Sequence, residues 1–151
     1  KNFDVTALDP DEQMLSLNNF EKKIIGKGEE LPFNENSFDN VLCCFVWRNV
    51  TDTEKTLSEV YRVLKPGGKF ILLDMTRPKN SFYKLIHKIG TYVLLHIVGF
   101  ITLNLKEYRF LYKSLDLYPQ PEVHLTKNNY TNLVIERIGL FDFVYLGVFT
   151  K

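Results

Sequence analysis

Residues 38–75 constrain the fold of this chain more than any other stretch of its sequence. Two near-continuous apolar runs, residues 41–46 and 70–73, have the composition of strands that are buried on both faces of a parallel sheet. Between them, the capping-box pair of Thr51 and Glu54 marks the start of a helix. Its apolar stripe consists of Leu57, Val60, Tyr61 and Leu64. This order of elements predicts a right-handed βαβ unit of a doubly wound α/β sheet.

The residues that follow each predicted strand are the candidates for function, because ligands of doubly wound sheets lie over the carboxyl ends of the strands. The first central strand (residues 40–46) is followed directly by Trp47, Arg48 and Asn49. An earlier strand near the N-terminus leads into Asp9. A carboxylate at that position either caps the next helix or accepts hydrogen bonds from ribose hydroxyls.

Length and composition are those of one ordinary α/β domain, which we assign to residues 1–151. The formal net charge of +1 argues against a dedicated nucleic-acid binder, which would carry a basic face. Cys43 and Cys44 are adjacent in a predicted buried strand and form neither a disulfide framework nor a metal pattern. The three histidines are too scattered for a metal site. These features predict a protein without metal in a reducing compartment, the cytoplasm.

Residues 82–105 are the most apolar segment of the chain. The core of this segment, residues 89–103, is shorter than the roughly 18 residues that a membrane-spanning helix needs. Two interpretations stay open for the helical insert at 80–118, which follows the strand at residues 69–75. It is a hairpin or bent helix packed on the domain, or an apolar surface that covers a greasy substrate or contacts lipid at the periphery of a membrane.

The remaining segments complete an order of β α β β α β, a helical insert, and then α β. We expect strands at residues 4–8, 24–25 and 142–149, and helices at 12–22, 107–118 and 126–138, the last capped by Thr126 and closed by Gly139.

Several segments together resemble class I S-adenosylmethionine-dependent methyltransferases. The shared blocks are residues 8–15 (LDPDEQML), 29–33 (EELPF), 36–39 (NSFD) and 61–68 (YRVLKPGG). The block at 45–52 (FVWRNVTD), with 108–111 (YRFL), is similar to the branch that C-methylates prenylated precursors of ubiquinone and menaquinone. The resemblance implies a Rossmann-like sheet, mostly parallel with helices on both faces, and a small-molecule acceptor. A homodimer is left open.

The resemblance also implies S-adenosylmethionine as the cofactor and assigns residues to it by position. Asp9 would hold the ribose, and Pro10 and Met14 would lie near the adenine. Gly28 and Glu29 would lie at the end of a strand beside the adenine amino group, and Cys44 and Phe45 would run beneath the methionine part.

On the acceptor side, the resemblance implies that Arg48 and Asn49 are catalytic. Arg48 would stabilise a phenolate, directly or through a water, because a ring carbon becomes nucleophilic only once its hydroxyl is ionised. Trp47, Tyr108 and Arg109 would bind the substrate. Three of these residues have an ordinary alternative: Arg48 pairs with an acid such as Asp52 or Glu107, Asn49 caps a turn, and Tyr108 belongs to a core.

The chain departs from the family pattern in three places. No Gly-x-Gly precedes Asp9, although that loop lets the backbone approach the methionine carboxylate, so we expect an N-terminally incomplete sheet. Lys27 stands where relatives often have an aspartate, and an ammonium cannot accept a hydrogen bond from adenine. Relatives also end with an antiparallel pair of strands, of which residues 143–149 supply one.

The alternatives in function are a methyltransferase of another small molecule or a lipid, a non-catalytic module that binds S-adenosylmethionine, and an NAD-dependent enzyme. The last rests on Asp9 alone, and the Leu-Pro-Phe and Arg-Asn-Val blocks argue against it.

Overall fold

The computed structural model describes residues 3–118, 120–125, 130 and 132–151. Along the chain the elements are β1 (Thr6–Asp9), α1 (Glu12–Ser16), β2 (Lys22–Ile25), β3 (Phe38–Cys44), the 3-10 helix η1 (Trp47–Asn49), α2 (Thr53–Val63), β4 (Leu64–Met75), α3 (Ser81–Ile101), α4 (Leu105–Leu117), α5 (Pro121–His124), β5 (Asn132–Ile138), the 3-10 helix η2 (Leu140–Asp142) and β6 (Val144–Thr150). The α/β class is confirmed, and β3, α2 and β4 form the predicted βαβ unit.

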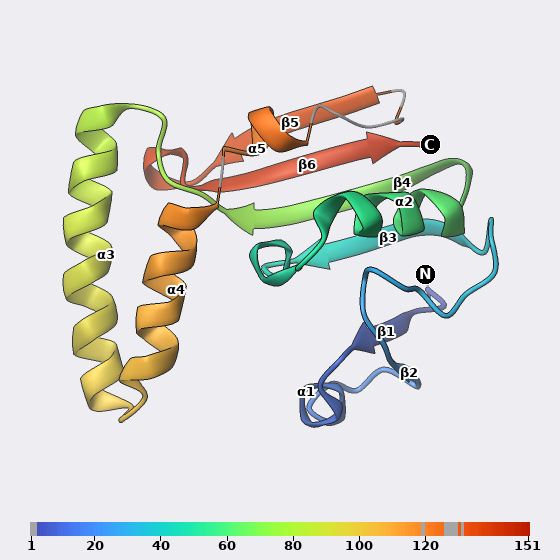
Figure 1. Ribbon diagram of the computed structural model, residues 1–151, viewed down its shortest axis with the longest axis horizontal. Helices are drawn as coiled ribbons and strands as arrows, with labels where there is room; N and C mark the ends of the chain where they lie inside the picture. The colour runs from blue at the N-terminus through green and yellow to red at the C-terminus, as the bar shows by residue number, and fades with distance from the viewer. Residues whose placement is uncertain (1–2, 119, 126–129, 131) are drawn as a thin grey trace.

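The strands form two sheets, one of four strands in the order β3-β4-β6-β5 and one of two strands, β1-β2 (Figure 1). Pairing is parallel for β1–β2 and β3–β4 and antiparallel for β4–β6 and β5–β6. The antiparallel share is therefore larger than expected. Among the described residues, no strand pairing joins β1 to β3. This gap between the two sheets is what an N-terminally incomplete sheet predicts.

Close backbone packing explains the glycine pair in Lys-Pro-Gly-Gly at the start of β4. Gly67 has a φ of +77°, a conformation that favours glycine. A Cβ on Gly68 would lie 2.8 Å from the carbonyl oxygen of Lys65 and 3.0 Å from that of Asp39. The turn from α2 into β4 therefore depends on both glycines.

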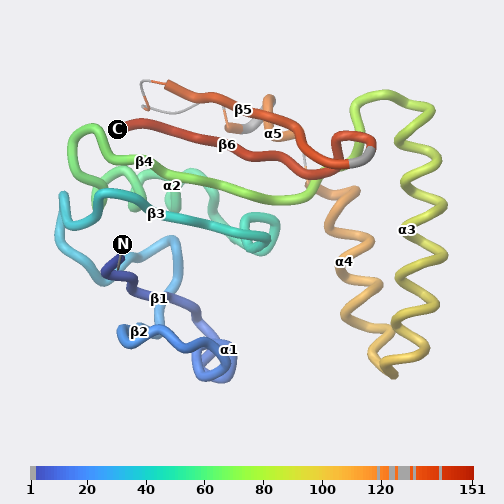
Figure 2. Tube along the Cα trace, turned by 180° about the vertical axis from the view of Figure 1, so that it is seen from behind, coloured from blue at the N-terminus to red at the C-terminus, as the bar shows by residue number. Residues whose placement is uncertain are grey.

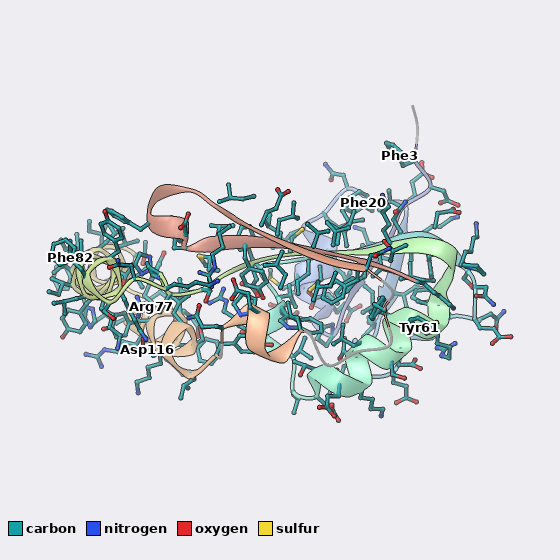
Figure 3. The ribbon with its side chains drawn as sticks, turned by 90° about the horizontal axis from the view of Figure 1, so that it is seen from above. Phe3, Phe20, Tyr61, Arg77, Phe82 and Asp116 are labelled. Atoms are coloured by element: carbon teal, nitrogen blue, oxygen red, sulfur yellow. The ribbon has the colours of Figure 1, made fainter. Side chains whose placement is uncertain are left out.

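The hydrophobic core lies between one face of the four-stranded sheet and the helices α2 and α5 (Figure 3). The apolar stripe of α2 supplies Leu57 and Val60, and Asp52 caps the helix by accepting a hydrogen bond from the Lys55 N–H. The N-cap thus lies one residue later than expected, because Asp52 takes the role given to Thr51. The other buried apolar members of this core are Trp47, Leu64, Phe70, Leu72, Leu125, Tyr145 and Phe149.

The opposite face of this sheet corrects the expectation of helices on both faces. Leu42 on β3 is 66% exposed and Val134 on β5 is 54% exposed. None of the described helices covers these residues, so the strand β3, expected to be buried on both faces, is buried on one.

Helices α3 and α4 form an antiparallel hairpin at the end of the sheet (Figure 2). Arg77, which is 1% exposed and follows β4 by two residues, bonds to both helices. Its Nε donates to Asp116 Oδ1 at 3.0 Å, and its Nη1 donates to Thr91 Oγ1 at 2.8 Å and to His87 Nδ1 at 3.1 Å. Burial and the Arg77 charge lower the pKa of His87, which keeps the ring a neutral acceptor. The guanidinium also lies 4.8 Å above the Tyr112 ring.

Two expected helices are wrong in part or whole. The helix expected at 12–22 ends at Ser16, and Lys22 belongs to strand β2. The helix expected at 126–138 is a strand, β5, where it is described, and its expected cap Thr126 lies outside the described residues. Because β5 pairs with β6, the chain has the antiparallel pair that it was expected to lack.

Candidate functional site

The candidate site lies at the carboxyl ends of β1, β3 and β4. The arrows of these three strands all point toward the side of the molecule on which the α3–α4 hairpin lies (Figure 1). Asp9 ends β1, η1 follows β3, and Asp74 is near the end of β4. The predicted donor and acceptor residues are thus at the same end of the strands and not at opposite ends.

Asp9 is not the cap of the helix that follows it. That role belongs to Asp11, whose Oδ1 accepts hydrogen bonds from the N–H groups of Gln13 at 2.8 Å and Met14 at 3.3 Å. The Asp9 Oδ1 accepts from the Asp11 N–H at 2.8 Å, and Asp9 forms no ion pair with a described residue. The geometry therefore removes the helix-cap alternative and leaves a half-buried carboxylate whose Oδ2 bonds to no described residue. Pro10 and Met14 beside it are exposed.

Gly28 and Glu29 contact α2 and the residues just before it, and so help to position this helix. A Cβ on Gly28 would lie 2.9 Å from Thr56 Cγ2, so this glycine allows the loop to contact α2. Glu29 Oε1 accepts from the N–H groups of Thr51 at 3.0 Å and Asp52 at 3.3 Å. Burial would raise the pKa of Glu29, but these backbone hydrogen bonds lower it below its ordinary value. The Glu29 carboxylate is therefore engaged within the protein.

The backbone is strained where β3 ends. Cys44 is exposed, and Phe45 has a φ of +58°, in the left-handed region that side chains other than glycine rarely adopt. The Phe45 N–H donates to the Leu73 carbonyl at 2.7 Å, which holds this conformation. Strain of this kind, of order 1–3 kcal/mol, is concentrated at functional sites. Phe45 itself is 46% exposed.

Arg48 forms a buried ion pair with Asp74, an acid on β4 that lies 26 residues further along the chain. The Arg48 Nε donates to Asp74 Oδ1 at 2.7 Å, and its backbone N–H donates to Asp74 Oδ2 at 3.1 Å. The side chains are 5% and 0% exposed. Arg48 Nη1 also donates to Ser114 Oγ on α4 at 2.9 Å. The pairing alternative is thus correct in kind, but Asp52 and Glu107 are not the partners.

Burial, together with the charge of Asp74, raises the pKa of two side chains near this pair. Burial and the Asp74 charge raise the pKa of Cys43 to about 12 and also raise the pKa of Tyr145. The Tyr145 hydroxyl is buried without a hydrogen-bond partner among the described residues. Asp74 is the one acid in the apolar run of β4, a signal that could have identified it from the sequence.

Trp47 and Asn49 lie on opposite sides of η1. The structure corrects the expectation that Trp47 binds the substrate, because its ring is fully buried in the core, 5.8 Å from the Phe70 ring between centroids. Asn49 is exposed, and its side chain forms no hydrogen bond with the described residues, so it caps no described turn. Asn49 therefore remains a candidate for contact with a ligand.

Tyr108 and Arg109 are both on α4 but in different surroundings. Tyr108 packs where α3 and α4 cross, because a Cβ on Gly99 would lie 3.2 Å from its Cδ2. Arg109 is exposed. Tyr108 is thus half-buried within the hairpin and is not part of the hydrophobic core. Among the described residues, no cluster of His, Cys, Asp and Glu could hold a metal ion.

The architecture is shared with solved methyltransferase structures. A SAM-dependent methyltransferase of Thermotoga maritima aligns with a TM-score of 0.65 at 20% identity, covering 95% of this chain and 72% of that chain. A protein of Pyrococcus horikoshii aligns with a TM-score of 0.61 at 19% identity, covering 98% and 73%. The fold is thus that of the class I methyltransferases.

The family follows from sequence. The ubiE/COQ5 methyltransferase family matches residues 1–133, and the chain belongs to this family. A ubiquinone/menaquinone biosynthesis C-methyltransferase UbiE of Rickettsia felis is 39% identical over 132 residues, 80% of this chain and 53% of the relative. The same-named protein of Rickettsia typhi is 40% identical over 111 residues, 72% and 45%. The chain spans about half the length of the curated relatives it matches.

Proposed function

We propose that this protein is an S-adenosylmethionine-dependent methyltransferase that C-methylates a prenylated quinone precursor. The names of its relatives support the class of reaction and acceptor. The observation that carries the proposal is the buried Arg48, which Asp74 and Ser114 hold at the carboxyl end of β3.

On the donor side, the residues around β1 fit S-adenosylmethionine. Asp9 keeps a carboxylate oxygen free for a ribose hydroxyl, and exposed Pro10 and Met14 offer apolar contact for an adenine ring. Glu29 does not share this role, because its carboxylate holds the backbone ahead of α2. When bound, the cofactor supplies a methyl group on a sulfonium. Cys44 and Phe45 remain proposed as the floor beneath it.

On the acceptor side, Arg48 has hydrogen-bonding capacity to spare. Its guanidinium carries five N–H groups, of which one bonds Asp74 and one bonds Ser114. The other three form no hydrogen bond with described residues. Asp74 weakens the field of this cation but fixes its orientation, and a donor that is oriented in advance stabilises a phenolate without reorganisation. Exposed Asn49 adds an amide beside it.

Arg48→Ala tests this assignment. We expect turnover of demethylmenaquinone with labelled S-adenosylmethionine to fall by about a hundredfold or more, while the dissociation constant of the donor, measured by calorimetry, stays within about twofold. Lys55→Ala on the exposed side of α2 serves as the control and should change neither. Equal loss of turnover and donor binding in an Arg48→Ala protein whose circular dichroism matches that of the unmodified chain would contradict an acceptor-side role.

Assays with other acceptors and titrations with other cofactors distinguish the proposed function from the alternatives. Methylation of unrelated phenols or lipids, but not of demethylmenaquinone, would replace the proposed acceptor. A chain that binds S-adenosylmethionine without transferring its methyl group to any acceptor would be a binding module, and heat on titration with NAD instead would indicate a dehydrogenase.

A prenylated acceptor is held in lipid, so we also propose that this protein works in the cytoplasm at the periphery of a membrane. Light scattering of the purified chain would test the homodimer, which stays an expectation.

A further inference from the structure

Helix α3 is long, apolar and exposed. It is a described helix that is long and apolar enough to cross a membrane, yet only 6% of its most apolar 18-residue stretch is buried. Figures 1 and 2 show it at the end of the molecule, beyond α4 and clear of the sheet. A helix of this composition would be buried if it served the core of the domain. Its exposure therefore requires another explanation.

Six of the exposed apolar residues of α3 lie along one side of the helix, which we call the outer face of α3. They follow one another by three or four residues, the spacing of a single helical face. This face consists of Phe82, Ile86, Ile89, Val93, Ile97 and Phe100, each between 40% and 73% exposed. Residues 89–105 contain no Asp, Glu, Lys or Arg. The outer face thus presents only apolar groups over about 27 Å, at about 1.5 Å per residue.

The hairpin is basic although the chain is nearly neutral. Residues 81–117, from the start of α3 to the end of α4, contain five Lys and Arg and two acids, a net charge of +3, which leaves −2 for the rest of a chain of net charge +1. Lys106, Arg109 and Lys113 recur along the exposed side of α4. None of these three forms an ion pair with a described residue. The excess positive charge of the hairpin is therefore available to an outside partner.

We propose that the hairpin docks this protein on an anionic lipid bilayer. The outer face of α3 lies among the upper acyl chains, and Lys106, Arg109 and Lys113 meet the headgroups, as in interfacial amphipathic helices. This inference deepens the proposed function, because a bilayer is the phase that holds a prenylated acceptor. It adds to the proposed function the surface of the protein that contacts the bilayer and the requirement for anionic lipid.

Two other arrangements fit the observations less well. A spanning α3 would carry its inner side into hydrocarbon, where His87 and Lys88 are bonded to Arg77 and Asp116. A dimer through the outer face of α3 would bring two hairpins of charge +3 together. An anionic surface instead matches both the apolar face and the charge beside it.

Vesicle flotation of the full chain, without donor or acceptor, tests the docking surface. We expect binding to vesicles of phosphatidylcholine and phosphatidylglycerol in equal parts. The double variant Arg109→Gln with Lys113→Gln should lower the partition coefficient about 30-fold, since each surface basic residue contributes roughly fivefold. Ile89→Asp with Val93→Asp should lower it by at least about tenfold, with or without anionic lipid. The far-ultraviolet circular dichroism of each variant should match that of the unmodified chain.

Matched controls use exposed residues of the same kind elsewhere. Leu42→Asp on the sheet and Lys55→Gln with Lys69→Gln should bind vesicles as the unmodified chain does. As a direct measure of depth, Ile89→Trp fluorescence should be quenched by lipid brominated in the acyl chains, whereas that of Leu42→Trp should not. Native Trp47 is fully buried and adds the same background to both.

The result that overturns the inference is absence of vesicle binding, or equal loss in Leu42→Asp. A dimer in light scattering that Ile89→Asp dissociates, without vesicle binding, would show a second copy as the partner. Methylation of a short-chain, water-soluble acceptor is measured in parallel. If that reaction persists while vesicle binding fails, the docking inference fails alone; if vesicle binding persists while methylation fails, the proposed function fails alone.

Discussion

The buried pair of Arg48 and Asp74 is the strongest electrostatic feature at the scale of single residues. The two side chains are almost fully excluded from solvent, and the pair joins the strand end of β4 to η1. Burying two charges costs as much free energy as their attraction returns, so such a pair need not add stability. Removing only one of the two charges is different, because the other charge is then left buried without a partner. The pair therefore serves to orient Arg48.

The variant Asp74→Asn should lower the free energy of unfolding by about 3–5 kcal/mol, because it leaves the Arg48 cation buried without its counterion. Urea denaturation measures this loss. The control is Asp39→Asn, whose side chain is 77% exposed and pairs with Lys65 on the surface; its loss should stay below about 1 kcal/mol. Similar losses for both variants would mean that Asp74 does not hold a buried cation.

Trp47 makes the second prediction at this scale, because its burial assigns it to the core and not to the acceptor. Trp47→Ala should destabilise the protein by about 3–5 kcal/mol, and Trp47→Phe by less. The KM for the quinone acceptor should be unchanged in Trp47→Phe, as steady-state kinetics would show. A large rise in KM with stability intact would return Trp47 to the substrate side.

At the scale of elements, one buried cation, Arg77, bonds to both helices of the α3–α4 hairpin. Arg77 follows β4 by two residues, and its bonds are to the side chains of Thr91 on α3 and Asp116 on α4. The outer face of α3 has no such support from the domain. The hairpin should therefore open more readily than the sheet, because its attachment rests on few buried contacts.

Arg77→Met should loosen the hairpin while the four-stranded sheet keeps its protection. Hydrogen exchange should accelerate at the backbone amides of α3 and α4 and stay unchanged in β4 and β6. Arg109→Met, an exposed arginine on the same hairpin, provides the matched control and should exchange as the unmodified chain does. Uniform acceleration in all elements of Arg77→Met would show that Arg77 stabilises the whole fold instead.

At the scale of the whole molecule, the Glu122 carboxylate connects segments that are far apart in the C-terminal half of the sequence. Glu122 accepts from Arg137 of β5 at 2.8 and 2.9 Å and pairs with Lys79, ahead of α3, at 2.9 Å. The Arg137 hydrogen bonds, against the opposing effect of burial, lower the pKa of Glu122 from 4.5 to about 2.

A lowered carboxyl pKa gives stability that is present above about pH 4.5 and is lost as pH falls toward 2. Glu122→Gln should therefore be less stable than the unmodified chain at pH 7, and the difference should shrink between about pH 4.5 and pH 2. Thermal unfolding across this range measures it. Glu35→Gln, an exposed glutamate, is the control. A difference that stays constant down to pH 2 would assign the effect to packing.

Local sequence patterns predicted the elements whose hydrophobic periodicity fits only one type of secondary structure. The stripe of α2 and the apolar run of β4 produced the βαβ unit, and the Lys-Pro-Gly-Gly turn followed from backbone sterics. Residues 132–138 admit two periods, since Leu133 and Val134 fit a helix, while Leu133 and Ile135 fit a strand face. Pairing with β6 decided for the strand. That pairing depends on a partner later in the chain, which local spacing does not contain.

The sequence by itself determined the α/β class, the family and the placing of Asp9 and Arg48 at strand ends, because each rests on local spacing or on motif identity. Only the tertiary structure decided that Asp74 and Ser114, 26 and 66 residues away, hold Arg48, that Trp47 is core, and that α3 turns its apolar side outward. The physical reason is that ion pairing, burial and exposure depend on which distant segments meet. Those neighbours are set only when the chain folds.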